Sequence, residues 1–249
     1  MGNIITVGNR RGGTGKTFTT QTIGIGLHRK GYRVLLVDLD SQGNLSFDLG
    51  TCPNHDLDSL GVMLGERTAA ETIQHTKSGI DLIPSSERLA AADLLLKDPD
   101  CLRDAIRPIR SAYDWILIDT APSLGMLTVS ALTASDQVLI SAQAEIHSLQ
   151  GASMLIDSVN AVRRERNPKL EILGILLTRY NPRTVISRDM RYNFEVMAER
   201  IGSKVFQTAI RECTAVKESQ AMQTDIFTYS PKCNASIDYE QVIREIINR

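Results

Sequence analysis

The sequence predicts an α/β fold, in which helices flank a doubly wound and mostly parallel sheet. Short, uninterrupted apolar runs alternate with stretches of helical spacing, as expected when helices cover both faces of a sheet. The first run leads into a glycine-rich segment and then a helical pattern, and two later runs end in aspartate. Ligands of such sheets bind at the carboxyl ends of the strands. At 249 residues we expect one domain, over residues 1–249.

The composition is that of a soluble globular protein, with 42% hydrophobic and 23% charged residues. No apolar run approaches the roughly 18 residues of a membrane span, and the chain begins with a strand instead of a signal sequence. We therefore expect a cytoplasmic protein. The four cysteines form no C-x-x-C pair and the four histidines show no metal spacing, so we expect no metal or cluster site built from them.

The stretch from residue 4 to residue 20 carries the central chemistry. A β-branched apolar run is followed by a loop whose glycines permit positive φ, so that successive backbone N–H groups can surround an anion. These glycines are Gly12, Gly13 and Gly15. The helix that follows adds unpaired N–H groups and the positive end of its dipole. Lys16 would reach the β- and γ-phosphates of a nucleotide, and the Thr17 hydroxyl would bind Mg²⁺.

The strict P-loop pattern G-x-x-x-x-G-K-[ST] is not met, because Arg10 occupies its first glycine position. The segment resembles the deviant Walker A motif K-G-G-x-G-K-[ST] of the ParA/MinD family of dimeric ATPases, with Arg11 in place of the first lysine. An arginine keeps the positive charge of that lysine and could still bridge phosphate oxygens, although its guanidinium group has a different reach. The resemblance implies a P-loop NTPase fold of the deviant Walker A class, ATP and Mg²⁺ as cofactors, and catalytic roles for Arg11, Lys16 and Asp40. It also implies nucleotide contacts from Gly12, Gly13, Thr14, Gly15, Lys16, Thr17 and Phe18.

A predicted buried strand begins at Arg33, and its apolar run, residues 34–37, leads into two acids, Asp38 and Asp40. Both should lie beside the phosphate loop, where two carboxylates would repel a triphosphate unless Mg²⁺ or a proton relay uses them. The segment is similar to the family motif D-x-D-P-Q-G-N, with Ser41 in place of proline. This similarity implies that Asp38 helps to hold the Mg²⁺ hydration shell and that Asp40 orients the attacking water. A turn or helix-cap role is the alternative for Asp40.

A third apolar run, residues 115–118, ends at Asp119 in the manner of a Walker B motif, whose carboxylate binds Mg²⁺ directly or through water. The following D-x-x-P-S-L-G resembles the version in the ParA subgroup. The predicted metal residues are therefore Thr17, Asp38 and Asp119. Further strands are predicted at 80–83, 138–140 and 172–177, and helices over 87–110 and 184–201. Residues 45–79 show no pattern from which a chemical role can be assigned.

Several weaker assignments follow from the resemblance. The exit of the strand at 172–177 would contact the adenine ring through Arg179 to Asn181, with Arg179 and Asn181 as the candidate contacts. The stretches 210–219 and 229–232, the latter with Pro231, would close over the nucleotide. The segment after residue 141 is similar to the family's E-Y-x-A-L-E-G, so Glu145 either approaches Arg11 across a dimer or is a solvated surface residue.

Charge is unevenly distributed: 13 Lys and Arg stand against 17 Asp and Glu in residues 1–150, but 15 against 12 in residues 151–249. The basic half is where we expect an anionic partner. In the family an ATP-bound homodimer binds DNA nonspecifically, and a ParB-like centromere-binding partner stimulates its hydrolysis. Arginines that could bind phosphates are Arg163, Arg164, Arg166, Arg183, Arg188 and Arg191, and for each a solvated helix face is the alternative.

The resemblance thus implies a DNA partition ATPase, which would be cytoplasmic and nucleoid-associated, and other functions of related ATPases are the alternatives. A MinD-like ATPase needs a carboxyl-terminal amphipathic helix with lysines and bulky apolar residues, whereas residues 239–249 carry two acids and two arginines and predict a helix packed on the domain. We therefore expect no membrane partner. A metallocluster carrier or a tyrosine-kinase relative would need paired cysteines or a tyrosine-rich tail. The first strand begins so early that we also expect no operator-binding domain before it.

Overall fold

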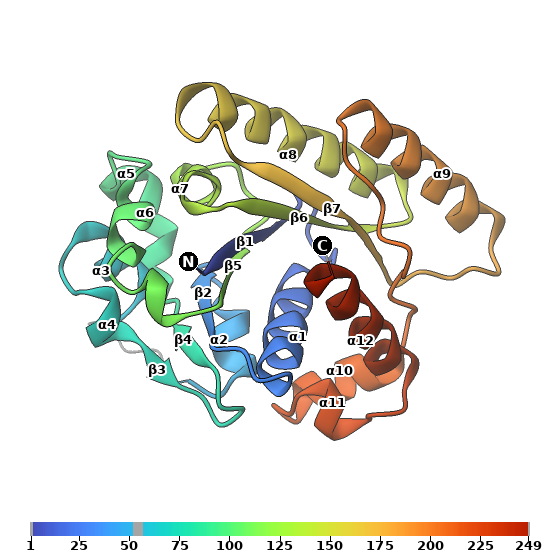
Figure 1. The fold of residues 1–249 in the computed structure, drawn as a ribbon, viewed down its shortest axis with the longest axis horizontal. Coiled ribbons are helices and arrows are strands. Elements are labelled where there is room, and N and C mark those ends of the chain that lie inside the picture. The colour runs from blue at the N-terminus through green and yellow to red at the C-terminus, as the bar shows by residue number, and fades with distance from the viewer. Residues whose placement is uncertain (1, 52–56, 249) are drawn as a thin grey trace.

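The computed structural model describes residues 2–51 and 57–248 and contains one central sheet (Figure 1). Within these residues the sheet has seven strands in the order β3-β4-β2-β5-β1-β6-β7, parallel except for the β3–β4 pair. The strands are β1 (Asn3–Gly8), β2 (Val34–Leu39), β3 (Gln74–His75), β4 (Asp81–Ile83), β5 (Trp115–Thr120), β6 (Gln137–Gln143) and β7 (Glu171–Thr178). The predicted α/β fold and its six parallel strands are confirmed.

Helices cover both faces of the sheet, as Figure 1 shows. One face packs against α1 (Lys16–Arg29), α10 (Thr214–Ala221), α11 (Ile226–Tyr229) and α12 (Asn234–Ile247). The other face packs against α3 (Ser59–Leu64), α6 (Cys101–Ile106), α7 (Met126–Ala134), α8 (Ile146–Glu165) and α9 (Val185–Arg200). Alternate residues of the buried strands enter the two cores, as Ile4 and Ile5 of β1 do.

The register of the central strands brings the predicted site residues together. Val7 of β1 pairs with Asp119 of β5, and Asp119 also pairs with Asp38 of β2. Because these strands are parallel, their carboxyl ends meet at one edge of the sheet. The phosphate loop, which follows β1, therefore lies beside both acids.

The structure adds elements in one part of the chain where the sequence predicted none, and it divides one predicted helix. Residues 45–79 contain α2 (Asn44–Asp48), α4 (Ala69–Thr72) and the short antiparallel β3, although 52–56 lie outside the described residues. The helix predicted over 87–110 is divided into η1 (Glu87–Ala91), α5 (Ala92–Leu95), α6 and η2 (Arg110–Ala112), with Pro99 in the interruption between α5 and α6. The helical spacing within 87–110 favours a core position for Leu94, but Leu94 is 85% exposed on the four-residue helix α5.

The carboxyl-terminal helix α12 packs its apolar face on α1. Tyr239, Val242, Ile243 and Ile246 are buried there, and a Cβ on Gly26 of α1 would lie only 2.1 Å from Ile243 Cδ1. This confirms the predicted helix packed on the domain. In the described parts of the chain, every helix is too short or too polar to cross a bilayer.

Candidate nucleotide-binding site

A cavity of about 580 Å³ opens at the carboxyl edge of the sheet. Its walls come from the phosphate loop, the end of β2, the end of β7 and the segment that leads into α10. The lining residues are Gly12, Gly13, Gly15, Lys16, Thr17, Phe18, Asp40, Gln42, Asn44, Asp48, Pro122, Thr178, Arg179, Ile210, Arg211, Glu212, Cys213, Val216, Lys217, Gln220 and Tyr239. Most predicted loop residues thus share one cavity.

Side chains at the ends of two strands donate hydrogen bonds to carbonyl groups of the phosphate loop and hold the loop against the sheet. The Gly13 carbonyl accepts a hydrogen bond from Gln143 Nε2 (2.5 Å), and the Thr14 carbonyl accepts from Ser141 Oγ (2.5 Å) and Thr178 Oγ1 (2.8 Å). In a trans peptide the N–H points opposite to the carbonyl, so the N–H groups that follow these carbonyls point away from the strands. Gly13 and Gly15 have φ of 77° and 80°, which glycine adopts without strain. The backbone N–H groups of the loop are therefore oriented to bind an anion before the ligand arrives.

Sequence reasoning did not find these anchoring residues. Gln143 and Ser141 stand at the end of β6, and Thr178 stands at the end of β7, more than a hundred residues after the loop. Asn9, also missed, is buried and donates to the Ser141 carbonyl (2.9 Å). Polar residues at strand ends are the available signal, but which loop they hold becomes visible only once the strands are paired.

The amino terminus of α1 faces the same cavity. Its cap is Gly15, and within the described residues no side chain caps it and no acidic residue stands in its first turn. The positive end of the dipole is thus left for a ligand. Lys16, only 6% exposed, donates to the Arg11 carbonyl at 3.3 Å. Burial lowers the pKa of Lys16 from its ordinary value, while the nearby Asp119 and Asp40 oppose that shift.

Asp38 is buried and fully engaged in hydrogen bonds. Its carboxylate accepts from Ser46 Oγ (2.7 Å), Ser46 N (2.9 Å) and Asp40 N (3.1 Å). Burial nevertheless raises the pKa of Asp38 to about 6. The Asp38 carbonyl accepts from Ser59 Oγ at 2.7 Å. The side chain is therefore placed beside the cavity without lining it.

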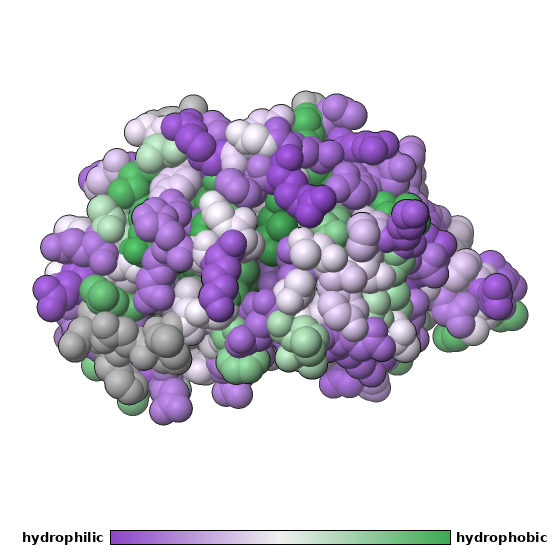
Figure 2. Space-filling model, turned by 90° about the horizontal axis from the view of Figure 1, so that it is seen from below, coloured by the Kyte–Doolittle hydropathy of each residue, from purple (hydrophilic) through white to green (hydrophobic). Residues whose placement is uncertain are grey.

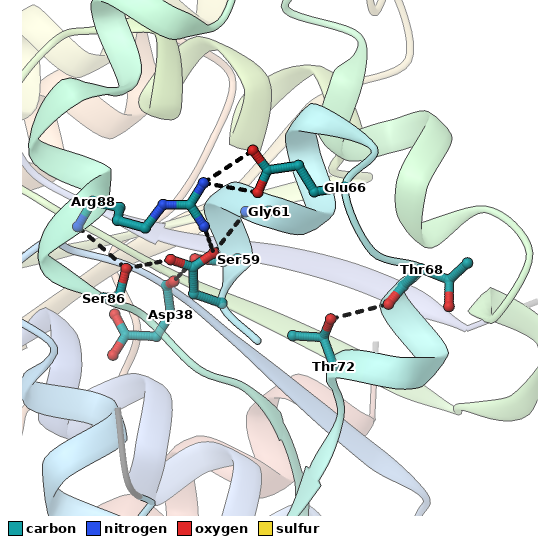
Figure 3. A network of polar contacts seen from close by, with 9 residues as sticks. Asp38, Ser59, Gly61, Glu66, Thr68, Thr72, Ser86 and Arg88 are labelled. Atoms are coloured by element: carbon teal, nitrogen blue, oxygen red, sulfur yellow. Dashed lines mark hydrogen bonds and ion pairs between the residues drawn. The ribbon is translucent and has the colours of Figure 1, made fainter. Parts of the chain in front are cut away.

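A polar network behind Asp38 orients this strand end (Figure 3). The buried Asp58 caps α3 by accepting from Gly61 N (2.7 Å), accepts a hydrogen bond from Ser86 Oγ, and lies 3.5 Å from Arg88 Nη1. Arg88 also binds Glu66 at 2.7 Å. The excursion at 45–79, to which the sequence assigned no chemistry, thus supplies Ser46, which binds the Asp38 carboxylate, and Ser59, which binds its carbonyl.

Asp119 is the acid best suited to a metal ion. It is completely buried, its Oδ1 accepts from Thr20 Oγ1 at 3.4 Å, and its Oδ2 has no hydrogen-bond partner among the described residues. Burial, with the facing Asp38, raises the pKa of Asp119 to about 8. An unpartnered buried carboxylate oxygen near the Thr17 hydroxyl fits Mg²⁺. The described residues contain no group of three or more His, Cys, Asp or Glu side chains that could hold a metal by themselves. Phosphate and water oxygens would therefore complete the shell.

Asp40 differs from the other two acids because it lines the cavity itself. It is 9% exposed, and its Oδ1 accepts a hydrogen bond from Gln42 N at 3.0 Å. Asp40 therefore does stabilise the turn, as the alternative assignment expects, and its side chain still lies at the surface of the cavity. This position is compatible with orienting a water molecule, which stays a prediction.

The far end of the cavity is partly apolar, as a purine site requires. Phe18 and Tyr239 contact each other edge to face at 5.7 Å, near Ile210 and Val216. Arg179 lines the cavity with φ of 49° and binds Glu212 at 2.8 Å. Two of the predicted nucleotide contacts, Asn181 and Pro231, do not line the cavity. Their roles in nucleotide binding stay predictions.

Arg11 lies outside this cavity. It is exposed and lines a separate shallow hollow of about 340 Å³ with Arg10, His147, Gln150, Gly151 and Met154. The start of α8 approaches the loop closely there, since a Cβ on Gly151 would lie 2.4 Å from Asn9 Oδ1 and 2.8 Å from Arg11 N. The side chain of Arg11 is thus presented to the surface beside the nucleotide site.

We expect Gly151→Ala to weaken ATP binding by roughly tenfold, because the added methyl group must displace Asn9 or the Arg11 backbone and with it the phosphate loop. Fluorescent ATP titration measures the effect. Ser153→Ala, on an exposed position of the same helix, is the matched control and should bind normally. Equal affinity of the two variants would contradict the assigned coupling of α8 to the loop.

The six predicted DNA-binding arginines fall into two groups. Arg163, Arg164 and Arg166 lie at the end of α8, just before β7 begins, and so at the edge of the sheet opposite the carboxyl ends of the parallel strands. Arg183, Arg188 and Arg191 lie at or near the beginning of α9, which follows the end of β7, so this group is on the cavity edge. The structure does not bring all six into one patch.

Four of these arginines make contacts within the chain. Arg163 donates to the Leu170 carbonyl at 2.6 Å, and Arg166 lies 3.6 Å from Asp100. Arg191 binds Glu195 at 2.9 Å. Arg164, Arg183 and Arg188 are exposed, with Arg188 donating to the Pro182 carbonyl at 3.2 Å.

Comparisons with known proteins identify the family of this chain. A family model described as an AAA domain matches residues 2–172. An uncharacterized protein of Mycobacterium tuberculosis is 40% identical over 99% of this chain and 79% of its own length. The chromosome partitioning protein ParA of Caulobacter vibrioides is 35% identical over 99% and 94%.

A solved structure is also similar over the whole chain. The cobyrinic acid a,c-diamide synthase of Mycobacterium smegmatis, solved with bound ADP and magnesium, is 31% identical, with a TM-score of 0.85 over 100% of this chain and 95% of that one. The family-model match and the alignment with ParA both cover the phosphate loop and the two strand ends that carry Asp38, Asp40 and Asp119. The chain belongs to the ParA/MinD family of deviant Walker A ATPases.

Proposed function

We propose that this protein is an ATP-dependent DNA partition ATPase. Its ATP-bound dimer binds DNA nonspecifically, in the cytoplasm on the nucleoid. Slow hydrolysis, stimulated by a ParB-like centromere-binding partner, resets it. Asp40 orients the attacking water, and Mg²⁺ lies between Thr17, Asp119 and, through water, Asp38.

The observation that carries the proposal is the position of the two loop cations. Lys16 is buried at the base of the cavity, whereas Arg11, five residues earlier, is exposed and outside it. Lys16 can therefore serve the nucleotide of its own subunit, while Arg11 is available to the phosphates of a second subunit. Such an arrangement makes dimerisation depend on ATP, because the γ-phosphate provides the shared charge.

Support for a DNA partner comes from the arginines that remain exposed. Arg183 and Arg188 stand near the beginning of α9, on the same edge as the nucleotide cavity. A change of subunit arrangement at that edge would alter how these cations are presented to a polyanion. Phosphate contacts of this kind need no base recognition, which suits binding without sequence preference.

The proposal is tested by binding to random-sequence duplex DNA with ATP, with ADP and without nucleotide, each at low and at raised salt. We expect tight binding only with ATP, and a steep loss of affinity as salt rises. Equal affinity for DNA with ATP, with ADP and without nucleotide would contradict the proposed ATP-dependent switch. Absence of binding in all conditions would contradict the DNA partner and direct the search to a protein or membrane cargo.

The Arg183→Ala, Arg188→Ala double variant should weaken ATP-dependent DNA binding and reduce the slope of log affinity against log salt by about 2, since each phosphate contact contributes about 0.9. Arg166→Ala is the matched control, because Arg166 is already occupied by Asp98 and Asp100. Fluorescence anisotropy at several salt concentrations measures both. A larger loss of DNA affinity in the Arg166→Ala control would show that the DNA-binding surface lies at the end of α8.

The alternative is a MinD-like positioning ATPase that acts on a membrane or a protein cluster. A membrane form would need an apolar helix face to insert, but the apolar face of α12 is buried on α1. Figure 2 shows that hydrophilic side chains cover most of the face seen from below in Figure 1, with apolar ones scattered among them. These observations favour DNA over a membrane as the cargo surface.

A further inference from the structure

The short helix α2 makes contacts on two sides of the nucleotide cavity through three successive residues. Ser46 binds the carboxylate of Asp38 at the end of β2. Phe47 and Asp48 accept hydrogen bonds from side chains of α10 and of the segment just after it. We propose that the contacts between α2 and α10 form a clasp along one side of the cavity, which slows the release of nucleotide and couples it to the end of β2.

Two glutamine amides make the clasp. Gln220 Nε2 donates to Asp48 Oδ2 at 2.9 Å, and Gln223 Nε2 donates to the Phe47 carbonyl at 2.7 Å. Asp48 is buried, and both Asp48 and Gln220 line the cavity. Separating the helices would leave a buried carboxylate without this donor, which is costly. The two contacts therefore hold α2 and α10 at a fixed separation.

The backbone conformation of Gln223 supports this role. Gln223 is the second residue after α10, and its φ of 45° lies in the left-handed region. Glycine is the usual residue at this position of a helix end, because a side chain makes the conformation strained. Gln223 instead supplies an amide that reaches α2, which glycine could not do. Since a strained backbone persists where surrounding contacts hold it, the contact with α2 helps to fix the end of α10.

The other side of α2 is attached to the sheet. Ser46 N and Ser46 Oγ donate to Asp38 Oδ2 at 2.9 Å and 2.7 Å, and Ser46 Oγ accepts from Ser85 N at 2.9 Å. With five residues, α2 is little more than one helical turn, so Ser46 cannot shift without moving Phe47 and Asp48. A displacement at the end of β2 is thus passed through α2 to α10.

The clasp connects two walls between which a nucleotide would lie. α2 contributes Asn44 and Asp48 to the cavity, and α10 contributes Val216, Lys217 and Gln220. A nucleotide enters and leaves more easily when these walls separate, and the clasp opposes that separation. Its removal should therefore raise the rates of association and release together. Loss of a direct contact with the nucleotide would instead raise the release rate with little change in association.

The clasp is tested first on the full chain without nucleotide. Hydrogen–deuterium exchange in α2 and α10 should be roughly tenfold faster in the Gln220→Ala, Gln223→Ala double variant than in the natural protein. Ser46→Ala should also speed hydrogen exchange in α10, although Ser46 binds Asp38 and Ser85 on the other side of α2. Gln241→Ala, the same substitution at an exposed position of α12 outside the cavity, is the matched control and should exchange normally.

Two outcomes of this measurement would overturn the proposal. Unchanged hydrogen exchange in α10 of the double variant would show that the clasp does not hold the helix. Faster hydrogen exchange confined to α2 in Ser46→Ala would show that α2 does not couple the end of β2 to α10. Neither result depends on whether the cavity binds ATP.

The effect on nucleotide release rests on the proposed nucleotide site and is measured separately. In stopped-flow experiments with fluorescent ADP, the double variant should associate and release roughly tenfold faster, with its Kd changed by less than about threefold. Rates equal to those of the natural protein and of Gln241→Ala, or faster release alone, would overturn control by the clasp. Failure of the natural protein to bind any adenine nucleotide would instead refute the nucleotide site, while hydrogen exchange would still decide whether the clasp exists.

Discussion

Lys16→Ala is expected to abolish ATP binding in the micromolar range. Lys16 is buried beside Asp119 and Asp40, so its ammonium is the charge that offsets those carboxylates when a triphosphate enters. Without it, the phosphates would face the acids directly. Breaking a buried charge pair costs about 3–5 kcal/mol, which corresponds to a loss of affinity of roughly a hundredfold to a thousandfold or more. Isothermal titration of ATP with Mg²⁺ measures the loss.

Lys217→Ala provides the matched control for this variant. Lys217 lines the same cavity but is exposed on α10. Its removal should change affinity by less than about fivefold, because an exposed charge contributes about 0–1 kcal/mol. Circular dichroism should show both variants folded. Normal ATP affinity in Lys16→Ala would remove the phosphate-loop assignment and the proposed function with it.

Asp40→Ala should separate binding from turnover. Asp40 lines the cavity and its described bond is to a neighbouring backbone N–H, so its removal leaves the phosphate loop and α1 in place. We expect ATP binding and ATP-dependent dimerisation to persist, while hydrolysis falls by about 10²–10⁴, the usual contribution of a group that positions or deprotonates the attacking water. Phosphate release under saturating ATP is the measurement, with light scattering for the dimer.

Asp40→Asn distinguishes a chemical role from a structural one. The amide oxygen can still accept from Gln42 N, so the turn is kept, but the negative charge is gone. If Asp40 acts on water, both variants should lose turnover to a similar extent. Recovery of turnover in Asp40→Asn would assign Asp40 to the turn alone, and full turnover in Asp40→Ala would exclude it from the mechanism.

The fold and the acidic strand ends could be predicted because their signals are local. β5 shows this well: a run of apolar residues predicts a buried strand, and its terminal Asp119 follows from the position of the carboxyl end. The division of 87–110 into short helices was harder, since several leucines recur at helical spacing on both sides of Pro99. Periodicity alone cannot show that Leu94 falls on an exposed turn.

The parts of the site that were missed depend on partners distant in sequence. Gln143 and Thr178 look like ordinary strand-end polar residues, and only the order of β1, β6 and β7 shows that they bind the loop carbonyls. Side-chain contacts between separate elements leave little trace in a single sequence.

The order of strands in the sheet also has a consequence for biosynthesis. β1 is the first strand to leave the ribosome, yet its neighbours are β5, where Asn3 pairs with Trp115, and β6, where Ile5 pairs with Gln137. The central strand must therefore stay solvated and unpaired until about half of the chain has been synthesised. Closing such long loops is slow, and apolar strand edges exposed meanwhile are prone to aggregate. A nascent chain of this topology gains from a chaperone over its first strand, and the nucleotide can stabilise the fold only near the end of translation.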